Sequence, residues 1–547
     1  MGSKGKYLQV CWTFFLMAAG LTAANNDRRV VEAAKRGDKN ELRTLLSQHA
    51  DVNAPQADGA TALAWAAHRD DLETADLLIR AGANPNAADD YGVTPLALAC
   101  TNRNAAMAEK LLQAGANPNV ALATGETPLM IAARTGSVDT VKSLLDHAAD
   151  VNAKGTEQGQ TALMWAVAER HAEVARTLIE HGADPNAHSR GGFTALLFAA
   201  RNGDMDSARV LLAGGANVNE GSPKVSKSPS AKAGERNGDG AAAPEKTAPA
   251  CNFNLDPNCG GLAEAKAAPA GMTPLLEAAA NGHEELAIFF LEKGADPNAA
   301  DSNGFTGLHF ALLKGISSIG GVQPHLAVTS YMFRPDMVEL VKALLARGAN
   351  PNTRLTKAPR LNIHSNTPRF SIVGATPFLL AAGAADINLM RILRAAGADP
   401  MLATTDNTTP LMVASGLGRY VDFPPAEEKY ALEAAKLTVE LGADINAVDE
   451  NGYTPLHGAA YVGANSIIQF LADKGANLDA RDKFKQTPLS IAEGLVGEGI
   501  AEGIGDFSKK PFGPHPSAAK LLLQLGAAPL PAQATQRADE VPATRGQ

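Results

Sequence analysis

Short apolar stretches alternate with polar breaks along almost the whole chain, and each stretch has helical spacing. In residues 94–119, Leu96 and Ala99 lie three positions apart, and a polar break separates them from Leu111. Apolar residues three or four positions apart lie on one face of a helix. The pattern therefore predicts two short helices in this segment, each with an apolar face for packing.

Local start and stop signals agree with this pair of helices. The hydroxyl of Thr94 suits a helix N-cap, and Pro95 suits the first helical position, where a missing N–H does no harm. Gly115 suits the end of the second helix, because glycine adopts the left-handed conformation without steric cost. Residues 117–119 (Asn-Pro-Asn) then begin a turn. Each unit is predicted to be helix, turn, helix and hairpin-like loop.

The same unit recurs along the chain, marked by a threonine two residues before a Leu or Phe. Of the ten intervals between successive marker threonines, six are 33 residues and one is 34. A fixed period of this size is typical of stacked repeats, in which each unit packs on its neighbours. Such a chain uses its surface for function more often than an enclosed pocket. The markers are Thr61, Thr94, Thr127, Thr161, Thr194, Thr273, Thr306, Thr376, Thr409, Thr454 and Thr487.

These motifs resemble the ankyrin repeat, whose pattern is T-P-L-H-x-A at a 33-residue period. The resemblance runs from about Asp27 to Ala527 and includes a polar first unit without the Thr-Pro-Leu phrase. It implies an all-α ankyrin-repeat α-solenoid of about 12 repeats, each a helix-turn-helix followed by a hairpin loop. The histidine of the family pattern is present only at His309 and His457, so its hydrogen bonds to neighbouring turns are expected in two repeats.

Changes in composition divide the chain into segments. Residues 25–220 hold repeats one to six, of which the first is a capping repeat with a water-facing side, and residues 271–527 hold repeats seven to twelve. Residues 221–270, rich in Ser, Pro, Ala, Lys and Gly, are predicted to be a flexible linker. Residues 528–547 are predicted to be a disordered tail.

Four inserts interrupt the period in the C-terminal half, and they carry aromatic and basic side chains. Three fall between the two helices of a repeat, in alternate repeats, and are expected to lie along the edge opposite the hairpin tips. The fourth lengthens a hairpin loop. Loops of this kind are often ordered and functional, and the alternative is packing onto neighbouring repeats. The inserts lie near residues 316–335, 417–428 and 497–516 (between helices) and 353–374 (hairpin).

The N-terminus has the features of a secretory signal peptide. Lys4 and Lys6 precede an uncharged stretch from Leu8 to Leu21, and small residues follow at positions 22–24. Residues 1–24 are therefore predicted to direct export to the periplasm or the exterior, leaving no stable membrane span after cleavage. An uncleaved anchor is the alternative, although the apolar stretch is short for a span.

The cysteines and the net charge narrow the chemistry further. Cys251 and Cys259 could close a small disulfide loop in an exported protein, or remain free thiols in the linker. Cys100 has the setting of a small buried apolar residue. The formal net charge of -9 argues against nucleic acid as a partner. The sequence contains no recognisable catalytic, metal or cofactor motif, so no cofactor is expected.

Two sets of residues are candidates for binding a protein partner. One set lies at the ends of the first helices, where proteins that resemble this one commonly meet partners, and the other lies in the hairpins. Arginine and aromatic side chains are frequent at binding hot spots, although exposed arginine is also ordinary surface. The first set is Arg69, Arg134, Arg170 and Arg201; the second is Tyr91, Phe193, Phe305 and Tyr453.

Together these features predict a non-enzymatic protein-protein interaction scaffold of the cell envelope. The concave groove and the hairpin tips would bind a protein partner, and the arginines would suit an acidic patch on it. The chain is similar to bacterial-type exported ankyrin-repeat proteins, which supports this hypothesis. The alternative is a small-ligand or enzymatic site built by the aromatic and basic inserts, which would need those inserts to enclose a pocket.

Overall fold

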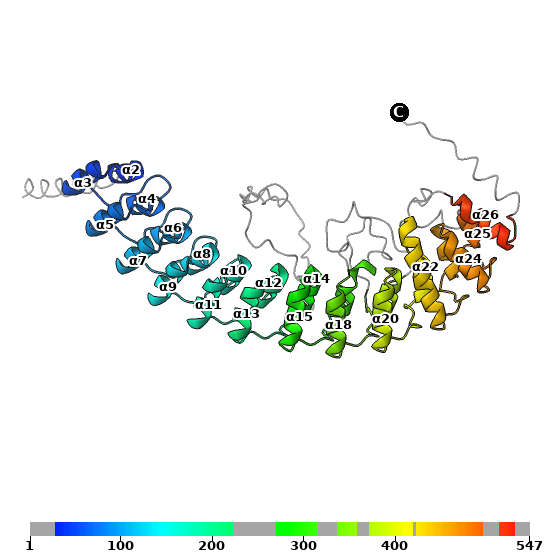
Figure 1. The fold of residues 1–547 in the computed structure, drawn as a ribbon. Helices are drawn as coiled ribbons and strands as arrows, with labels where there is room; N and C mark the ends of the chain where they lie inside the picture. Colours follow the sequence, from blue (N-terminus) through cyan, green and yellow to red (C-terminus); the bar gives the residue numbers. More distant parts are fainter. Residues whose placement is uncertain are drawn as a thin grey trace, which may run out of the picture. The chain divides into compact units, whose positions relative to one another are not determined.

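The computed structural model describes residues 28–222, 270–315, 336–357, 371–419, 423–495 and 514–530. The chain divides into two compact units, Met1–Ala268 (unit 1) and Pro269–Gln547 (unit 2), and the division falls inside the predicted linker. Helices dominate both units (Figure 1). Across the described ranges, the strand-like pairing is limited to one antiparallel bridge between Ala300 and Thr306. The prediction of an all-α repeat fold is confirmed.

The described part of unit 1, residues 28–222, contains six helix pairs, which match the predicted repeats one to six. Each first helix contacts the first helix of the next repeat, and the second helices form a parallel layer. The first helices are α2 (Arg29–Arg36), α4 (Ala62–His68), α6 (Pro95–Thr101), α8 (Pro128–Thr135), α10 (Ala162–Ala168) and α12 (Ala195–Asn202). The second helices are α3 (Lys39–Ser47), α5 (Leu72–Arg80), α7 (Ala105–Gln113), α9 (Val138–Asp146), α11 (Ala172–Glu180) and α13 (Met205–Ala213).

Unit 2 repeats the arrangement with less regular helices. The first helices are α14 (Pro274–Asn281), α16 (Gly307–Ala311), α19 (Pro377–Gly383), α21 (Pro410–Ala414), α23 (Pro455–Tyr461) and α25 (Pro488–Ala492). The second helices are α15 (Glu284–Glu292), α18 (Val338–Ala346), α20 (Ile387–Ala395), α22 (Pro425–Glu440), α24 (Asn465–Asp473) and α26 (Pro516–Leu525).

The local signals in the sequence act as expected. Thr94 Oγ1 accepts a hydrogen bond from Ala97 N at 3.2 Å, and Pro95 is the first residue of α6. Asn104, which lies in the polar break between the two helices, also caps α7, accepting from Met107 N at 2.9 Å. Each cap supplies an acceptor for a backbone N–H that the helix itself cannot satisfy. In this repeat the two helices are thus started separately, by Thr94 and by Asn104.

A ladder of asparagine side chains joins the loops that follow successive second helices. Asn152 shows the pattern: its Nδ2 donates to Gly182 O at 3.0 Å, and its Oδ1 accepts from Asp184 N at 2.8 Å. Each rung therefore satisfies two backbone groups of the next repeat with one side chain. The other complete rungs are made by Asn53, Asn86, Asn119, Asn186, Asn298, Asn352 and Asn446.

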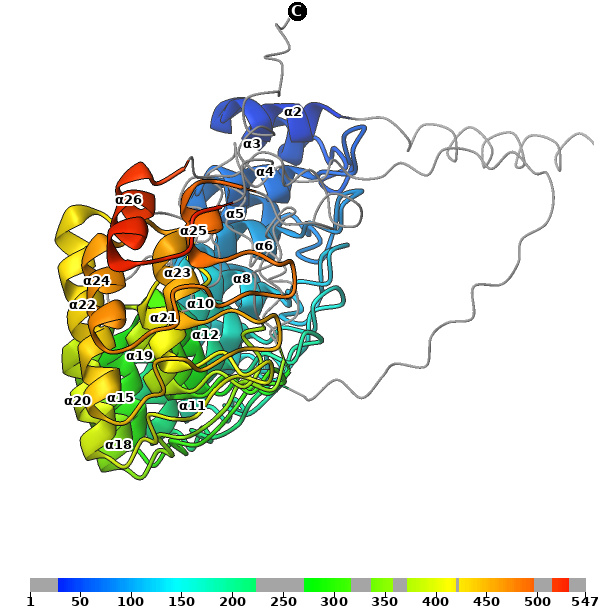
Figure 2. The ribbon, with the colours of Figure 1, turned by 90° about the vertical axis from the view of Figure 1, so that its right-hand side faces the viewer.

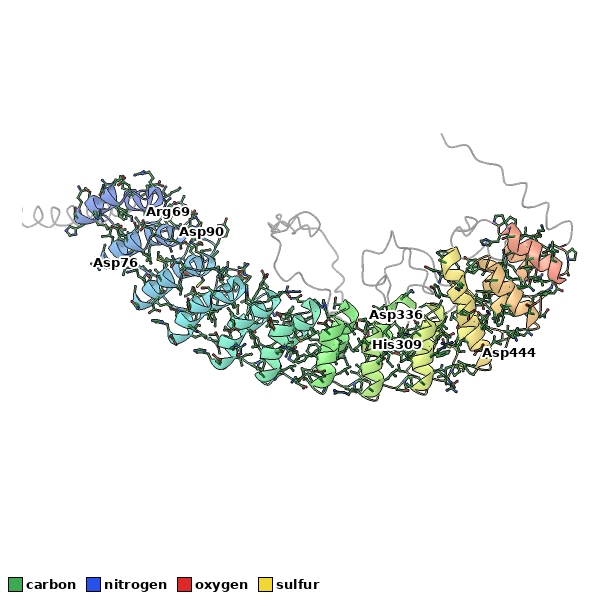
Figure 3. The ribbon with its side chains drawn as sticks, viewed as in Figure 1. Arg69, Asp76, Asp90, His309, Asp336 and Asp444 are labelled. Carbon is green, nitrogen blue, oxygen red and sulfur yellow. The ribbon has the colours of Figure 1, made fainter. Side chains whose placement is uncertain are left out.

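Two junctions within unit 2 have no asparagine to form a complete rung. At the junction before the twelfth repeat, Asp479 makes half of the rung, because its Oδ1 accepts from Ala528 N at 2.9 Å. Met401 occupies the asparagine position before the tenth repeat, and its side chain is 41% exposed. Its own turn is retained, because Met401 N donates to Asp399 Oδ1 at 2.9 Å. Asp444 is the residue whose amide a rung would reach (Figure 3). The ninth and tenth repeats are therefore held together without this pair of hydrogen bonds.

The two histidines of the family pattern link adjacent repeats from within the core. His309 and His457 are buried, and their Nε2 atoms lie 3.4 Å from Ala375 O and 3.3 Å from Gln486 O in the next hairpin. Burial lowers the pKa of each imidazole to about 4, so both rings are neutral near pH 7. The expected histidine links to neighbouring turns are confirmed.

Backbone hydrogen bonds also connect consecutive hairpins. Ala123 N donates to Tyr91 O at 3.1 Å, and Arg190 N donates to Gln158 O at 2.8 Å. These bonds hold the hairpins of unit 1 together on one side of its helices (Figure 2). Each first helix begins next to a hairpin and runs away from it. The layer of first helices is therefore bordered by the hairpins on one edge and by the ends of the first helices on the other.

Candidate binding surfaces and cleft

The ends of the first helices in unit 1 carry a row of cations, which we call the basic row. It contains the four arginines predicted from the sequence and three further cations at equivalent positions. Arg36 stands where Arg69 stands in the next repeat, and Arg103 stands where Arg170 does. Lys35, Arg36 and Arg103 could have been identified from the sequence by their positions relative to the turn that follows each first helix. The basic row is Lys35, Arg36, Arg69, Arg103, Arg134, Arg170 and Arg201.

Acidic residues are few at these positions, and the second unit lacks the row. Within unit 1, Asp70 and Glu169 are the acids among the corresponding turn residues. Asp70 is partly engaged, since its Oδ1 accepts from Asn102 Nδ2 at 3.1 Å and from Asn104 Nδ2 at 3.0 Å. In the described part of unit 2, the equivalent positions offer one cation, Lys314. The basic row is therefore a local feature of a chain whose net charge is negative.

Aromatic rings orient several of these cations. The Lys35 ammonium lies 5.1 Å from the ring centroid of Trp65 in the next repeat. The Arg134 guanidinium lies 5.5 Å from Trp165, also in the next repeat, and Arg201 lies 4.3 Å from Phe193. A cation above an aromatic face gains about 0.5–1 kcal/mol at an exposed site. The rings thus limit the freedom of these cations.

Backbone carbonyls orient two others. Arg69 Nη1 donates to Lys35 O at 3.2 Å, and Arg170 donates to Asn202 O, so each spans two repeats. Both side chains remain exposed. Arg69 projects from the first-helix layer, whereas Asp76 belongs to the second-helix layer of the same repeat (Figure 3). These arginines combine a structural contact with an exposed charge.

The four predicted hairpin aromatics divide into two groups. Tyr91 is 71% exposed, whereas Phe193, Phe305 and Tyr453 are 4%, 5% and 5% exposed. The buried rings pack on the following helix: Phe193 stacks on Phe198 with centroids 5.2 Å apart. Their burial assigns them to the core, which corrects the expectation of a set of hairpin aromatics at the surface. Tyr91 is the member that a partner can reach.

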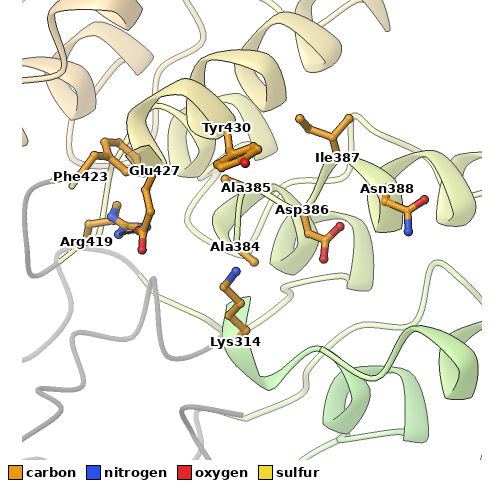
Figure 4. A pocket seen from close by; sticks show the side chains of 10 residues that line it. All are labelled: Lys314, Ala384, Ala385, Asp386, Ile387, Asn388, Arg419, Phe423, Glu427 and Tyr430. Carbon is orange, nitrogen blue, oxygen red and sulfur yellow. Dashed lines mark hydrogen bonds and ion pairs between the residues drawn. The ribbon is translucent and has the colours of Figure 1, made fainter. Parts of the chain in front are cut away.

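A cleft of about 350 Å³ lies in unit 2, between the ninth repeat and the start of α22 (Figure 4). One wall is the turn before α20, including Asp386, and the opposite wall carries Arg419, Glu427 and Tyr430. Arg419 is only 8% exposed, and its Nη2 donates to Glu427 Oε2 at 3.2 Å. The guanidinium also lies 4.2 Å from the ring centroid of Phe423. The cleft therefore joins a fixed cation to aromatic and acidic groups.

Part of this cleft comes from the predicted insert at residues 417–428, but the insert is not a loop throughout. α22 begins at Pro425 and has 16 residues, whereas α20 and α24 have nine. Proline suits the first helical position, and the acids Glu427 and Glu428 favour the first turn because of the helix dipole. The prediction of a loop is wrong for residues 425–428, which extend the second helix instead.

A second acidic group of unit 2, Asp336 (Figure 3), interacts electrostatically with two residues that line the cleft, Asp386 and Lys314. Both carboxyl oxygens of Asp336 are buried, and neither has a hydrogen-bond partner of good geometry among the described residues. Burial and the nearby charge of Asp386 raise the pKa of Asp336 to about 7. Lys314 offsets part of this effect. The pKa of the Asp336 carboxyl group therefore lies near neutrality.

The remaining chemistry of the described residues is sparse. They contain no group of three His, Cys, Asp or Glu side chains placed to hold a metal ion. Cys100 is a buried free thiol, and burial raises its pKa far above the ordinary value, as the interpretation of an apolar core residue requires. Cys251, Cys259, residues 1–24 and most of the inserts at 316–335, 353–374 and 497–516 lie outside the described residues, as does the tail beyond residue 530.

Family models match most of the repeat units described above. Models for ankyrin repeats match residues 30–122, 106–189, 191–222, 275–319 and 439–492, which together exceed half of the chain. The chain belongs to the ankyrin-repeat family. Its stacked helix pairs are therefore ankyrin repeats, and the basic row lies at the ends of their first helices.

Relatives of this ankyrin-repeat protein match it over limited stretches. It is 39% identical over 57 residues to an ankyrin repeat-containing protein of Schizosaccharomyces pombe, covering 10% of this chain and 28% of the relative. It is 40% identical over 73 residues to the neurogenic locus Notch protein of Drosophila melanogaster, covering 13% of this chain and 3% of the relative. The E3 ubiquitin-protein ligase KEG of Arabidopsis thaliana is 26% identical over 352 residues, which are 57% of this chain and 19% of the relative.

These matches support a protein-interaction module, since ankyrin repeats generally bind proteins. The chain spans less than a third of the length of each of these relatives. In the ankyrin-repeat protein itself, none of the described helices is both long and apolar enough to cross a membrane.

Proposed function

We propose that this ankyrin-repeat protein is a non-enzymatic scaffold that binds an acidic protein partner through unit 1. The observation that carries the proposal is the basic row. Its seven cations lie at successive turns along one edge of the first-helix face, and five of them are exposed. Arginine is a frequent hot-spot residue, and a row of like charges favours a partner of opposite charge.

Tyr91 extends this surface to the hairpin edge. It is the exposed member of the predicted aromatic set, and Asp89 Oδ1 accepts from its backbone N–H at 2.9 Å, which fixes the turn. A rigid aromatic side chain provides contact area at low cost in conformational entropy. We infer that a partner lies across the first helices and contacts both the basic row and Tyr91.

We also propose that the scaffold acts outside the cytoplasm, in the cell envelope or as a secreted protein. The support comes from residues 1–24, whose two lysines, uncharged stretch and small residues have the order of a secretory signal. N-terminal sequencing of the protein recovered from a cell fraction tests this directly. A protein that begins at residue 25 in the periplasmic or secreted fraction supports export, and an uncleaved cytoplasmic protein contradicts it.

The partner proposal is tested by quantitative capture from the envelope fraction. Tagged wild-type protein is compared with the double variant Arg69→Glu/Arg103→Glu, because both side chains are exposed and their replacement leaves the core intact. We expect the recovery of the main captured protein to fall about tenfold, which corresponds to ~1.4 kcal/mol of binding free energy. Recovery should also fall with added salt, since the contacts are solvent-exposed charges.

A control variant separates specific binding from a general charge effect. Arg43→Glu/Arg80→Glu makes the same change of charge on the exposed second-helix layer of the first two repeats. Equal recovery with the two double variants, or undiminished recovery with the first, contradicts the assignment of the partner to the basic row.

The cleft of unit 2 supports a second candidate function, the binding of a small charged ligand. The specific observation is that one insert contributes Arg419, Phe423 and Glu427 to an open cleft with both charge signs on its walls. Thermal-shift screening of zwitterionic metabolites against wild type and Tyr430→Ala tests it, since Tyr430 is 57% exposed at the cleft. A ligand that stabilises both proteins equally, or no ligand at all, contradicts this candidate.

A further inference from the structure

The second-helix side of unit 1 contains a separate cleft, with a volume of about 580 Å³. It lies at the helix-helix turns of the fourth to sixth repeats, between the first turns of α9 and α11 and the side of α13. Its lining includes Arg170, a member of the basic row, so the cleft adjoins the proposed binding edge at one residue. Its described lining contains no group of three side chains placed to hold a metal ion.

Three arginines from consecutive elements line this cleft. Arg170 comes from the turn before α11, Arg176 from α11 and Arg209 from α13. Two carboxylates, Glu173 and Asp206, also lie on its walls. Guanidinium groups in this arrangement can each direct two N–H donors to a carboxylate, which is the geometry that arginine favours.

Arg176 and Glu173 form an ion pair in the cleft that is weak and exposed. Arg176 Nη2 lies 3.4 Å from Glu173 Oε1, and the two side chains are 53% and 72% exposed. Exposed pairs of this kind contribute little to stability, because water competes for both charges. An incoming carboxylate can therefore take over the Arg176 guanidinium at little cost.

The helices that open into the cleft add to its positive potential. Ser137 and His171 occupy the N-cap positions of α9 and α11, and neither side chain accepts a hydrogen bond from its helix. Both side chains are instead engaged elsewhere: the Ser137 hydroxyl is hydrogen-bonded to Thr140 Oγ1 at 2.7 Å, and His171 Nε2 lies 3.1 Å from Arg134 O. By contrast, Asp204 caps α13 of the next repeat. Uncapped N–H groups and the helix dipoles strengthen the attraction of the arginines for an anion.

We propose that this cleft receives carboxylate side chains from an acidic, Asp- or Glu-rich segment of a protein partner. The inference rests on the proposed function, because the segment would continue from the basic row across Arg170. A carboxylate is favoured over a phosphate group, since Glu173 and Asp206 repel a doubly charged group more strongly than a singly charged one. The cleft then fixes the position of a partner that the basic row attracts.

The test uses fluorescence anisotropy with a fluorescein-labelled octaglutamate peptide and the full-length protein. The variant is Arg176→Ala/Arg209→Ala, and the control is Arg43→Ala/Arg80→Ala, which removes two arginines from the same helix layer outside the cleft. We expect saturable binding that the cleft variant weakens about tenfold and the control changes less than twofold. Thermal unfolding of each variant confirms that the fold is retained.

Equal affinities of the cleft variant and the control overturn the proposal, because they would show only general attraction to positive charge. A labelled phosphoserine peptide that binds more tightly than octaglutamate also overturns it. The measurement does not involve the cellular partner. If octaglutamate does not bind but capture of the partner still depends on Arg69 and Arg103, the cleft assignment fails and the proposed function stands. If octaglutamate binds through Arg176 and Arg209 but capture does not depend on Arg69 and Arg103, the proposed function fails and the cleft is still a carboxylate site.

Discussion

The missing rung at Met401 allows a direct measurement of what the asparagine ladder contributes. Replacing Met401 by Asn places an amide side chain in a turn that already has the required form, since residue 401 N donates to Asp399 Oδ1 at 2.9 Å as in the other turns. The new side chain would donate to Gly442 O and accept from Asp444 N, by analogy with Asn352 one repeat earlier. The substitution removes little apolar burial, because Met401 is 41% exposed.

The magnitude follows from the rung made by Asn352. Its Nδ2 donates to Gly397 O at 3.1 Å, and its Oδ1 accepts from Asp399 N at 2.8 Å. A hydrogen bond contributes about 0.5–1.5 kcal/mol net, and exposed loop positions fall at the low end. We therefore expect Met401→Asn to raise the local free energy of opening by ~1–2 kcal/mol, and Asn352→Met to lower it by a similar amount at its own junction.

Native-state hydrogen exchange is the appropriate assay, because long repeat arrays often unfold in parts and a single global stability is then poorly defined. In Met401→Asn, the Asp444 amide should exchange about tenfold more slowly, which corresponds to ~1.4 kcal/mol. In Asn352→Met, the Asp399 amide should exchange faster by a similar factor. Unchanged exchange of Asp444 in the first variant, together with faster exchange of Asp399 in the second, would show that the tenth-repeat junction differs in geometry and would refute the transfer of the rung.

Three further results are expected. Ala148 has a φ of 62° at a position where other repeats have glycine, so Ala148→Gly should raise the free energy of unfolding by about 0.5–1 kcal/mol in chemical denaturation, whereas Gly115→Ala should lower it by about 1 kcal/mol. The pKa of His457 is lowered to about 4, so the neutral ring contributes fully to the free energy of unfolding above pH 6.5, and this contribution is lost as the pH falls towards 4. Thermal melts should show up to about 3 kcal/mol less stability at pH 4 than at pH 6.5. The loss should be smaller in His457→Gln. The pKa of Asp336 is raised to about 7, so its effect on stability has the opposite pH dependence. The stability that the protonated carboxyl group allows below pH 4 is lost as the pH rises to 7, by at most about 4 kcal/mol. Asp336→Asn should abolish this pH dependence.

The local signals of a repeat were sufficient to predict its helices. Thr94 and Gly115 act within four residues of their own positions, so their effect is independent of what packs around them. The rungs of the asparagine ladder are different, because Asn152 reaches backbone groups about 30 residues away. The period indicates that residues 152 and 184 occupy equivalent places, but the side-chain geometry that joins them depends on the stacking distance between repeats.

The candidate site was predicted less completely than the fold. The positions of Arg69 and Arg170 followed from the end of a first helix, and Arg103 could have been found in the same way. The burial of Phe193 could not, because it depends on the ring of Phe198 and on the Arg201 side chain above it. A hairpin residue in the sequence has no fixed exposure until the next helix is placed against it.

The broken rung and the cleft of unit 2 occur at the same junction, and we interpret them as connected. The walls of the cleft come from the ninth repeat, at Asp386, and from the tenth, at Arg419 and Tyr430. These are the two repeats that Met401 leaves without a rung. A junction with fewer fixed hydrogen bonds opens at lower cost, so the spacing of its two walls is less strictly set. A ligand that contacts both walls would supply a restraint that asparagine provides elsewhere, and the free energy of that restraint would appear as ligand-dependent stability. Regular repeats gain rigidity from the ladder, whereas at this junction no asparagine rung fixes the spacing that a ligand on both walls would set.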